Sequence, residues 1–113
     1  MNILLQHLRE PEMRTIEEIR KEIHETDRQM ARLFENRMKA VMEIAACKKA
    51  LGLPVLDEAQ EKRVLANNAE MIQNELIRPY YLTFMKEVMA ISRSFQESLI
   101  GDADFTPNEE KQQ

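Results

Sequence analysis

Glycine, proline, cysteine and tryptophan are scarce in this chain. Its 113 residues include 2 Gly, 4 Pro, 1 Cys and no Trp. Two glycines cannot supply the turns of a many-stranded β fold or a glycine-rich loop that binds phosphate. The single cysteine, Cys47, excludes an internal disulfide and a zinc site built from several cysteines. The length is that of one domain.

Long apolar runs and an excess of positive charge are also missing. No stretch approaches the ~18 consecutive apolar residues expected of a membrane-spanning helix. Residues 1–13 lack the pattern of a secretory signal, so we expect a cytoplasmic protein. The formal charge is -4, from 16 basic and 20 acidic residues, which argues against a nucleic-acid-binding protein. His7 and His24 have no partners at metal-ligand spacing, so we expect no metal site.

The residues that are abundant favour long helices. Charged residues make up 32% of the chain and apolar residues 43%. Thr15 and Glu18 have the spacing of a capping box, and apolar residues then recur at helical spacing. Neither Gly nor Pro follows until Gly52 and Pro54. The sequence therefore predicts a first helix over residues 16–51, ended by Gly52.

Two shorter helices are predicted after this connector. Asp57 is a candidate N-cap for a second helix whose apolar face continues to Leu76. Pro79 is tolerated in the first turn of a third helix, which runs to Gly101. We therefore predict an all-α protomer of three helices, with a leader over 1–13, a helical domain over 14–101 and a disordered acidic tail over 102–113.

The length of the first helix also predicts how the protein assembles. At 1.5 Å per residue this helix spans ~50 Å. A compact domain of about 100 residues has a radius of gyration of only ~13 Å. The far half of the helix still carries apolar residues that need cover. We therefore expect an intertwined helical homodimer in which the two protomers share their first helices.

Two basic residues interrupt the apolar face of the first helix. Arg37 and Lys48 stand where hydrophobic residues are expected, and eleven residues at ~100° each bring them within ~20° of one direction. They could converge on one small anion. In the alternative interpretation, both stems run along the apolar surface and their charges reach water.

Polar residues interrupt the other two helices as well. Glu61 lies on the inward side of the second helix, one turn after Asp57. In the alternative interpretation, Asp57 is simply the helix cap and has no role in binding. Ser92 and Gln96 are spaced i, i+4 on the apolar stripe of the third helix, where such a pair is commonly structural. Because buried charge is costly unless it is paired, these interruptions together predict a polar pocket inside the bundle.

Arg20 occupies a different position on the first helix. It lies ~100° around the helix from Arg37 and ~25 Å away, so the two cannot serve one site within a protomer. In an antiparallel dimer, Arg20 could instead reach the pocket of the other subunit.

The order and spacing of these residues resemble the all-helical (AroQ class) chorismate mutases. The resemblance covers residues 15–99 and rests on the segments and residues 19–23, Asp27, 33–37, Lys48, 52–55, Asp57, Glu61, Ser92 and Gln96. It implies an intertwined homodimer with two active sites, each completed by an arginine from the other subunit. The implied reaction is the Claisen rearrangement of chorismate to prephenate, in phenylalanine and tyrosine biosynthesis. It uses no cofactor, metal or covalent intermediate.

The same resemblance implies which residues bind the carboxylates of chorismate. Arg37 and Arg20 of the partner subunit hold the two carboxylates, and Ser92 assists. At one position the chain departs from the family, which often has arginine immediately before the glutamate that matches Glu61. Here that substrate-binding position is Gln60, so one cation near the pocket is lost.

The remaining roles implied by the resemblance concern the ether oxygen and the ring hydroxyl. Lys48 and Gln96 donate hydrogen bonds to the ether oxygen, which gains negative charge as its C–O bond breaks. Asp57 and Glu61 position the hydroxyl, and Glu61 also orients Lys48. Catalysis is then preorganised electrostatics and the holding of a reactive conformer.

Two alternative functions stay open at this point. An isochorismate pyruvate-lyase shares this fold and pocket chemistry. A non-catalytic member of the family could instead regulate a partner enzyme of the aromatic pathway, and Gln60 is the residue that keeps this alternative open.

Overall fold

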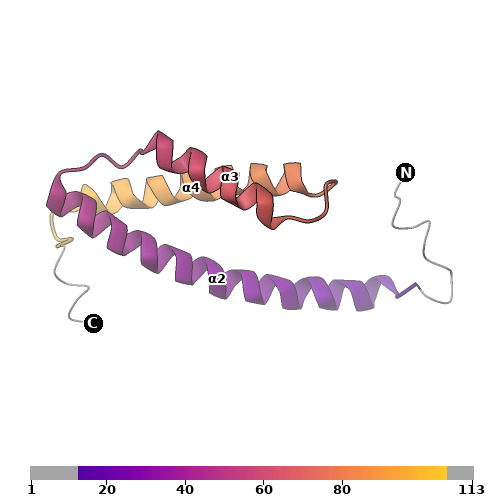
Figure 1. Ribbon diagram of the computed structural model, residues 1–113. Coiled ribbons are helices and arrows are strands. Elements are labelled where there is room, and N and C mark those ends of the chain that lie inside the picture. Colours follow the sequence, from indigo (N-terminus) through magenta and orange to yellow (C-terminus); the bar gives the residue numbers. More distant parts are fainter. Residues whose placement is uncertain (1–12, 107–113) are drawn as a thin grey trace. The chain divides into compact units, whose positions relative to one another are not determined.

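A computed structural model describes residues 13–106 of the chain (Figure 1). This part contains the helices α2 (Ile16–Leu51), α3 (Glu58–Met71) and α4 (Arg78–Ile100), and no strand. The predicted all-α fold with a long first helix is confirmed. None of the described helices is long and apolar enough to cross a membrane. The chain divides after Asn36 into two compact units, which are taken in turn.

The first unit contains the predicted start of α2. The Glu18 backbone N–H donates to Thr15 Oγ1 at 3.1 Å, and the Thr15 N–H donates to Glu18 Oε1 at 2.8 Å. These two bonds form the predicted capping box. The bond from the Thr15 backbone, helped by its side chain, stabilises the carboxylate and lowers the pKa of Glu18 from its ordinary value.

Residues 13–36 are exposed throughout. They include large apolar side chains at helical spacing, such as Ile16 at 65%, Ile23 at 54% and Met30 at 46% exposure. An apolar row of this kind on one helix is typical of a surface that packs against another element. Residues 1–12, which make up nearly all of the predicted leader, lie outside the described residues.

The second unit begins with the end of α2. Gly52 has a φ of +67°, a backbone conformation that favours glycine, and the Leu53 N–H donates to the Lys48 carbonyl at 2.9 Å. This is the bond pattern of a Schellman cap. The predicted end of the first helix is thus confirmed together with its cause.

Helix α3 is shorter than its apolar pattern predicts. Asp57 caps its start as expected, because Asp57 Oδ1 accepts the Gln60 N–H at 3.1 Å. The helix ends at Met71 and does not extend to Leu76. Asn74 Oδ1 accepts the Leu76 N–H at 2.8 Å, and this local bond competes with the helical pattern.

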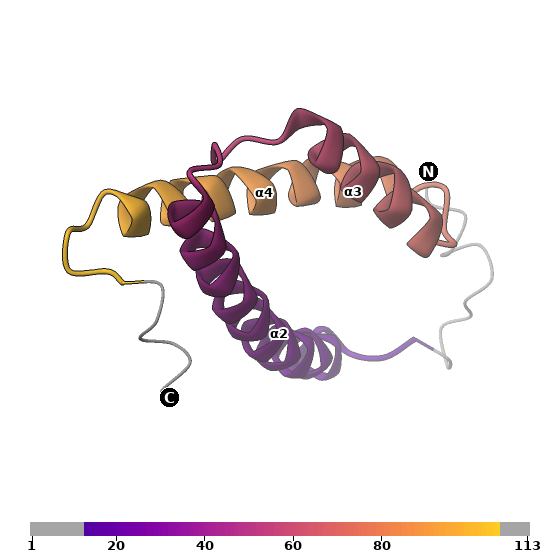
Figure 2. The same ribbon diagram turned by 60° about the vertical axis from the view of Figure 1, so that its left-hand side comes forward.

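Helix α4 runs antiparallel to α3 (Figures 1 and 2). Pro79 lies in its first turn and Gly101 is its C-cap, as predicted. The helices are tied together by Arg78, which donates to the Ala69 and Ile72 carbonyls at 2.9 and 2.6 Å. The buried side chains of α4 include the apolar residues Met85, Val88 and Met89 and the polar residues Ser92 and Gln96.

Residues beyond α4 fold back onto α2. Phe105 is only 8% exposed and packs with Ala45 and Ala46. Lys49 Nζ donates to the carbonyls of Asp102 and Phe105 at 2.9 and 2.6 Å. The predicted tail begins at Asp102. Of its residues 102–106, Phe105 belongs to this core and the other four are exposed, and residues 107–113 lie outside the described part.

Candidate active site

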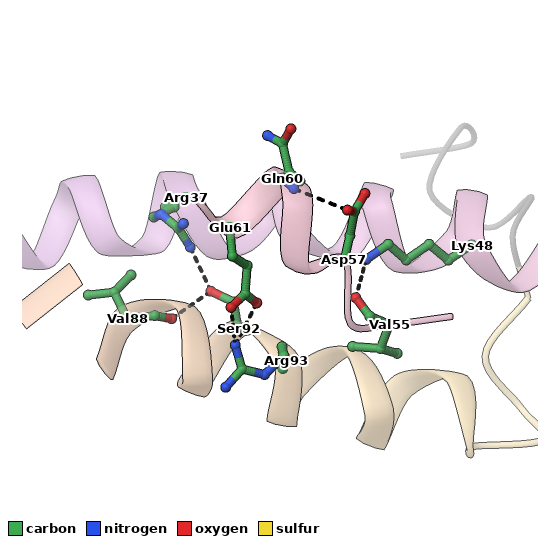
Figure 3. Close-up of polar contacts among 9 residues, drawn as sticks. All are labelled: Arg37, Lys48, Val55, Asp57, Gln60, Glu61, Val88, Ser92 and Arg93. Atoms are coloured by element: carbon green, nitrogen blue, oxygen red, sulfur yellow. Dashed lines mark hydrogen bonds and ion pairs between the residues drawn. The ribbon is translucent and has the colours of Figure 1, made fainter. Parts of the chain in front are cut away.

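Arg37 and Ser92 form the link between α2 and α4 (Figure 3). Arg37 Nη1 donates to Ser92 Oγ at 2.6 Å, and the same hydroxyl donates to the Val88 carbonyl at 2.8 Å. Ser92 is 5% exposed and Arg37 is half-buried. The hydroxyl therefore fixes the direction of the guanidinium, which turns toward α4.

Lys48 turns toward the connector between α2 and α3. Its Nζ donates to the Val55 carbonyl at 2.6 Å, and its side chain is half-buried. Arg37 and Lys48 thus have different partners among residues 13–106. An ammonium group has three donors, so two remain for a ligand.

Glu61 pairs with a residue that the sequence patterns do not single out. Arg93 Nη1 donates to Glu61 Oε1 at 2.6 Å and to Oε2 at 2.5 Å (Figure 3). The Arg93 and Glu61 side chains are 31% and 26% exposed. The expected orientation of Lys48 by Glu61 is not the contact found here. Arg93 could have been suspected, since a half-buried carboxylate needs a cation and Arg93 directly follows Ser92.

Gln96 carries an unpaired polar atom in the interior. The side chain is 7% exposed, and its Oε1 has no hydrogen-bond partner within the described chain. Leaving a buried acceptor unpaired costs about 1–3 kcal/mol. The amide is therefore a group whose hydrogen-bonding capacity is available to a ligand, as an acceptor and as a donor.

Asp57 is the N-cap of α3 and Gln60 lies in its first turn, and both are exposed. Asp57 acts as the helix cap, the structural alternative considered for it. Gln60 Oε1 accepts from Arg63 Nε and Nη2 at 3.1 and 2.8 Å, and Figure 3 shows its side chain directed away from Glu61. The side chain of Gln60 therefore makes no contact with the Arg37–Ser92 hydrogen bond.

Arg20 belongs to the first unit and is exposed on α2. Nothing in that unit pairs with it among the described residues. Its expected place in the site of the other subunit stays a prediction.

The second unit thus holds the donors Arg37 and Lys48 on α2 and Gln96 on α4 at partly or fully buried positions, and it pairs Glu61 of α3 with Arg93 of α4. Residues 13–106 contain no group of three or more His, Cys, Asp or Glu side chains that could hold a metal ion. Cys47 is exposed. An arrangement of fixed donors around partly buried positions suits the binding and electrostatic stabilisation of an anion.

Comparison with known proteins identifies the family. The sequence model of the family described as chorismate mutase type II matches residues 19–97. That range contains every predicted site residue from Arg20 to Gln96. No curated protein and no solved structure matches the chain.

Proposed function

Because the chain belongs to the chorismate mutase type II family, we propose that it rearranges chorismate to prephenate on the route to phenylalanine and tyrosine. The observation that carries this proposal is the Arg37–Ser92 bond, formed within one unit that also holds Lys48 and the buried amide of Gln96. The reaction is intramolecular. The protein must bind a dianion, hold its reactive conformer and stabilise charge at one oxygen.

Arg37 is suited to bind one carboxylate of chorismate. Its direction is fixed by Ser92 through a bond that uses only Nη1. The other N–H groups of the guanidinium can bind a carboxylate in a bidentate manner. We assign the second carboxylate to Arg20 of the partner subunit.

Lys48 and Gln96 are suited to stabilise the ether oxygen. One Lys48 donor goes to the Val55 carbonyl, which restrains the ammonium while two donors remain. Gln96 is buried, so a hydrogen bond from its amide acts with little competition from water. Donors fixed in advance at an oxygen that gains charge lower the barrier without reorganisation. Glu61 and Asp57 complete the proposal as groups that position the ring hydroxyl.

We also propose that the protein is a homodimer. The exposed apolar row of residues 13–36 needs cover, and a second copy of the same helix offers a matching surface. Arg20 is exposed on this segment, where the other subunit could receive it. In this arrangement each active site is complete only in the dimer.

The direct test is to mix the purified protein with chorismate and follow the loss of chorismate absorbance. We expect rearrangement well above the uncatalysed rate, with prephenate as product. Arg37→Ala should abolish it, because the carboxylate loses its cation. A rate equal to background in the wild type would refute the proposal.

Isochorismate serves as the control substrate. The same cations and amide could assist the breaking of its C–O bond, since that oxygen also gains negative charge. Formation of salicylate and pyruvate faster than prephenate is formed from chorismate would assign the lyase activity in place of the mutase.

A further inference from the structure

The mechanism above gives a role to Glu61 but none to Arg93, its ion-pair partner. Of the two ion pairs among residues 13–106, only this one joins two helices, α3 and α4. We infer that Arg93 is a positioning residue of the site, which holds Glu61 and offsets its charge so that a dianionic substrate can bind beside it. The inference rests on the proposed function, because it concerns the same site and substrate.

The placement of Arg93 supports this role. It follows Ser92 on α4 and precedes Gln96 by three residues, so the three lie within about one turn of the helix. Ser92 receives Arg37 from α2, and Arg93 reaches Glu61 on α3. One turn of α4 thus orients the charged groups of both neighbouring helices.

The negative charge of Glu61 explains why it needs a cationic partner. An unpaired carboxylate at the edge of the site would repel a dianion, and the low dielectric of a partly buried position strengthens that repulsion. Arg93 bonds both carboxylate oxygens through Nη1, which restrains the carboxylate and offsets its charge. The pair is half-buried, so water screens it less than it screens a surface pair.

The positive charge that pairs with Glu61 does not come from its neighbours on α3. Lys62 is exposed and forms no ion pair with Glu61 among the described residues. Gln60 is neutral, and its Oε1 is already bonded to Arg63. Arg63 is exposed and turned to Gln60. The cation that serves Glu61 therefore comes from α4.

The test is a double-mutant cycle on chorismate, with Arg93→Met, Glu61→Gln and the double variant. We expect Arg93→Met to raise KM about tenfold and to change kcat less than about threefold, because the loss concerns binding. In the Glu61→Gln background, where no charge needs to be offset, the same replacement should change KM less than about threefold. Arg93→Lys keeps the charge and should keep KM within about threefold of the wild type.

Lys86→Met is the matched control, because Lys86 is an exposed cation two turns earlier on α4. It should leave KM unchanged. If Arg93→Met does not fold, as judged by circular dichroism, Arg93→Gln replaces it in the cycle. An equal rise in KM in both backgrounds, or no rise in either, would overturn the inference. A wild type without activity on chorismate would instead refute the proposed function, and this role of Arg93 with it.

Discussion

Arg37 and Ser92 lie 55 residues apart in the sequence and are joined by a hydrogen bond of 2.6 Å. The serine hydroxyl also donates to Val88, so its single proton is used and its lone pair faces the guanidinium. The arrangement makes Ser92 the residue that orients Arg37. The short, buried side chain of Ser92 thus holds the long, flexible side chain of Arg37 in one direction.

Ser92→Ala should therefore weaken the enzyme without unfolding it. Arg37 keeps its charge but loses the acceptor that directs it, and we expect kcat/KM for chorismate to fall about tenfold, the effect of one hydrogen bond to a charged group. The melting temperature should change little, because alanine fits a serine site and favours a helix. Ser94→Ala, an exposed change on the same helix, is the control. Unchanged kcat/KM in Ser92→Ala would show that Arg37 needs no such support.

Replacing the adjacent residues Lys48 and Lys49 should have different effects, one on activity and the other on stability. Lys48→Ala removes a proposed donor to the ether oxygen, so kcat should fall roughly 10²–10³-fold while the fold persists. Lys49→Ala removes the bonds to the Asp102 and Phe105 carbonyls and should lower the free energy of unfolding by about 1–2 kcal/mol. Its kcat should stay close to that of the wild type. Activity assays and urea unfolding of both variants measure these effects. A loss of kcat in Lys49→Ala with normal kcat in Lys48→Ala would contradict the proposed role of Lys48.

The features set by local sequence were the ones that could be predicted. The ends of α2 follow from the Thr15–Glu18 capping box and from Gly52, each of which acts within a few residues. The inward positions of Ser92 and Gln96 follow from helical periodicity, and both are buried.

Contacts between distant segments could not be predicted in the same way. The partner of Glu61 depends on how α3 packs on α4, and periodicity places Arg93 beside the apolar stripe without naming its partner. Phe105 stands alone in a polar segment, so no repeating pattern marks it as a core residue. The end of α3 depends on the side chain of Asn74, which bonds to its own turn.

The capping box predicts how stability depends on pH. Because the pKa of Glu18 is lowered in the folded state, its contribution is present above the pKa of the unfolded chain and is lost as pH falls through the folded value. Glu18→Gln should therefore reduce helical stability at pH 7 and make a smaller difference at about pH 2–3, where protonation of the carboxylate removes its contribution. Urea unfolding followed by circular dichroism at both pH values measures this. Glu17→Gln, which changes a neighbouring exposed residue, should show a smaller difference between the two.

A mixture of two inactive variants tests whether the active site is shared between subunits. Arg20→Ala and Arg37→Ala should each abolish activity as homodimers, because every site lacks one cation. When the two are unfolded and refolded together, half of the dimers are mixed at random association. In each mixed dimer, one site combines an intact Arg37 with the partner subunit's Arg20, and the other site lacks both. The mixture should then recover about one quarter of the wild-type activity, the product of those two halves. Recovery depends on the exchange of subunits, so the variants combined without refolding are the control. No recovery after refolding would place Arg20 outside the site of the other subunit.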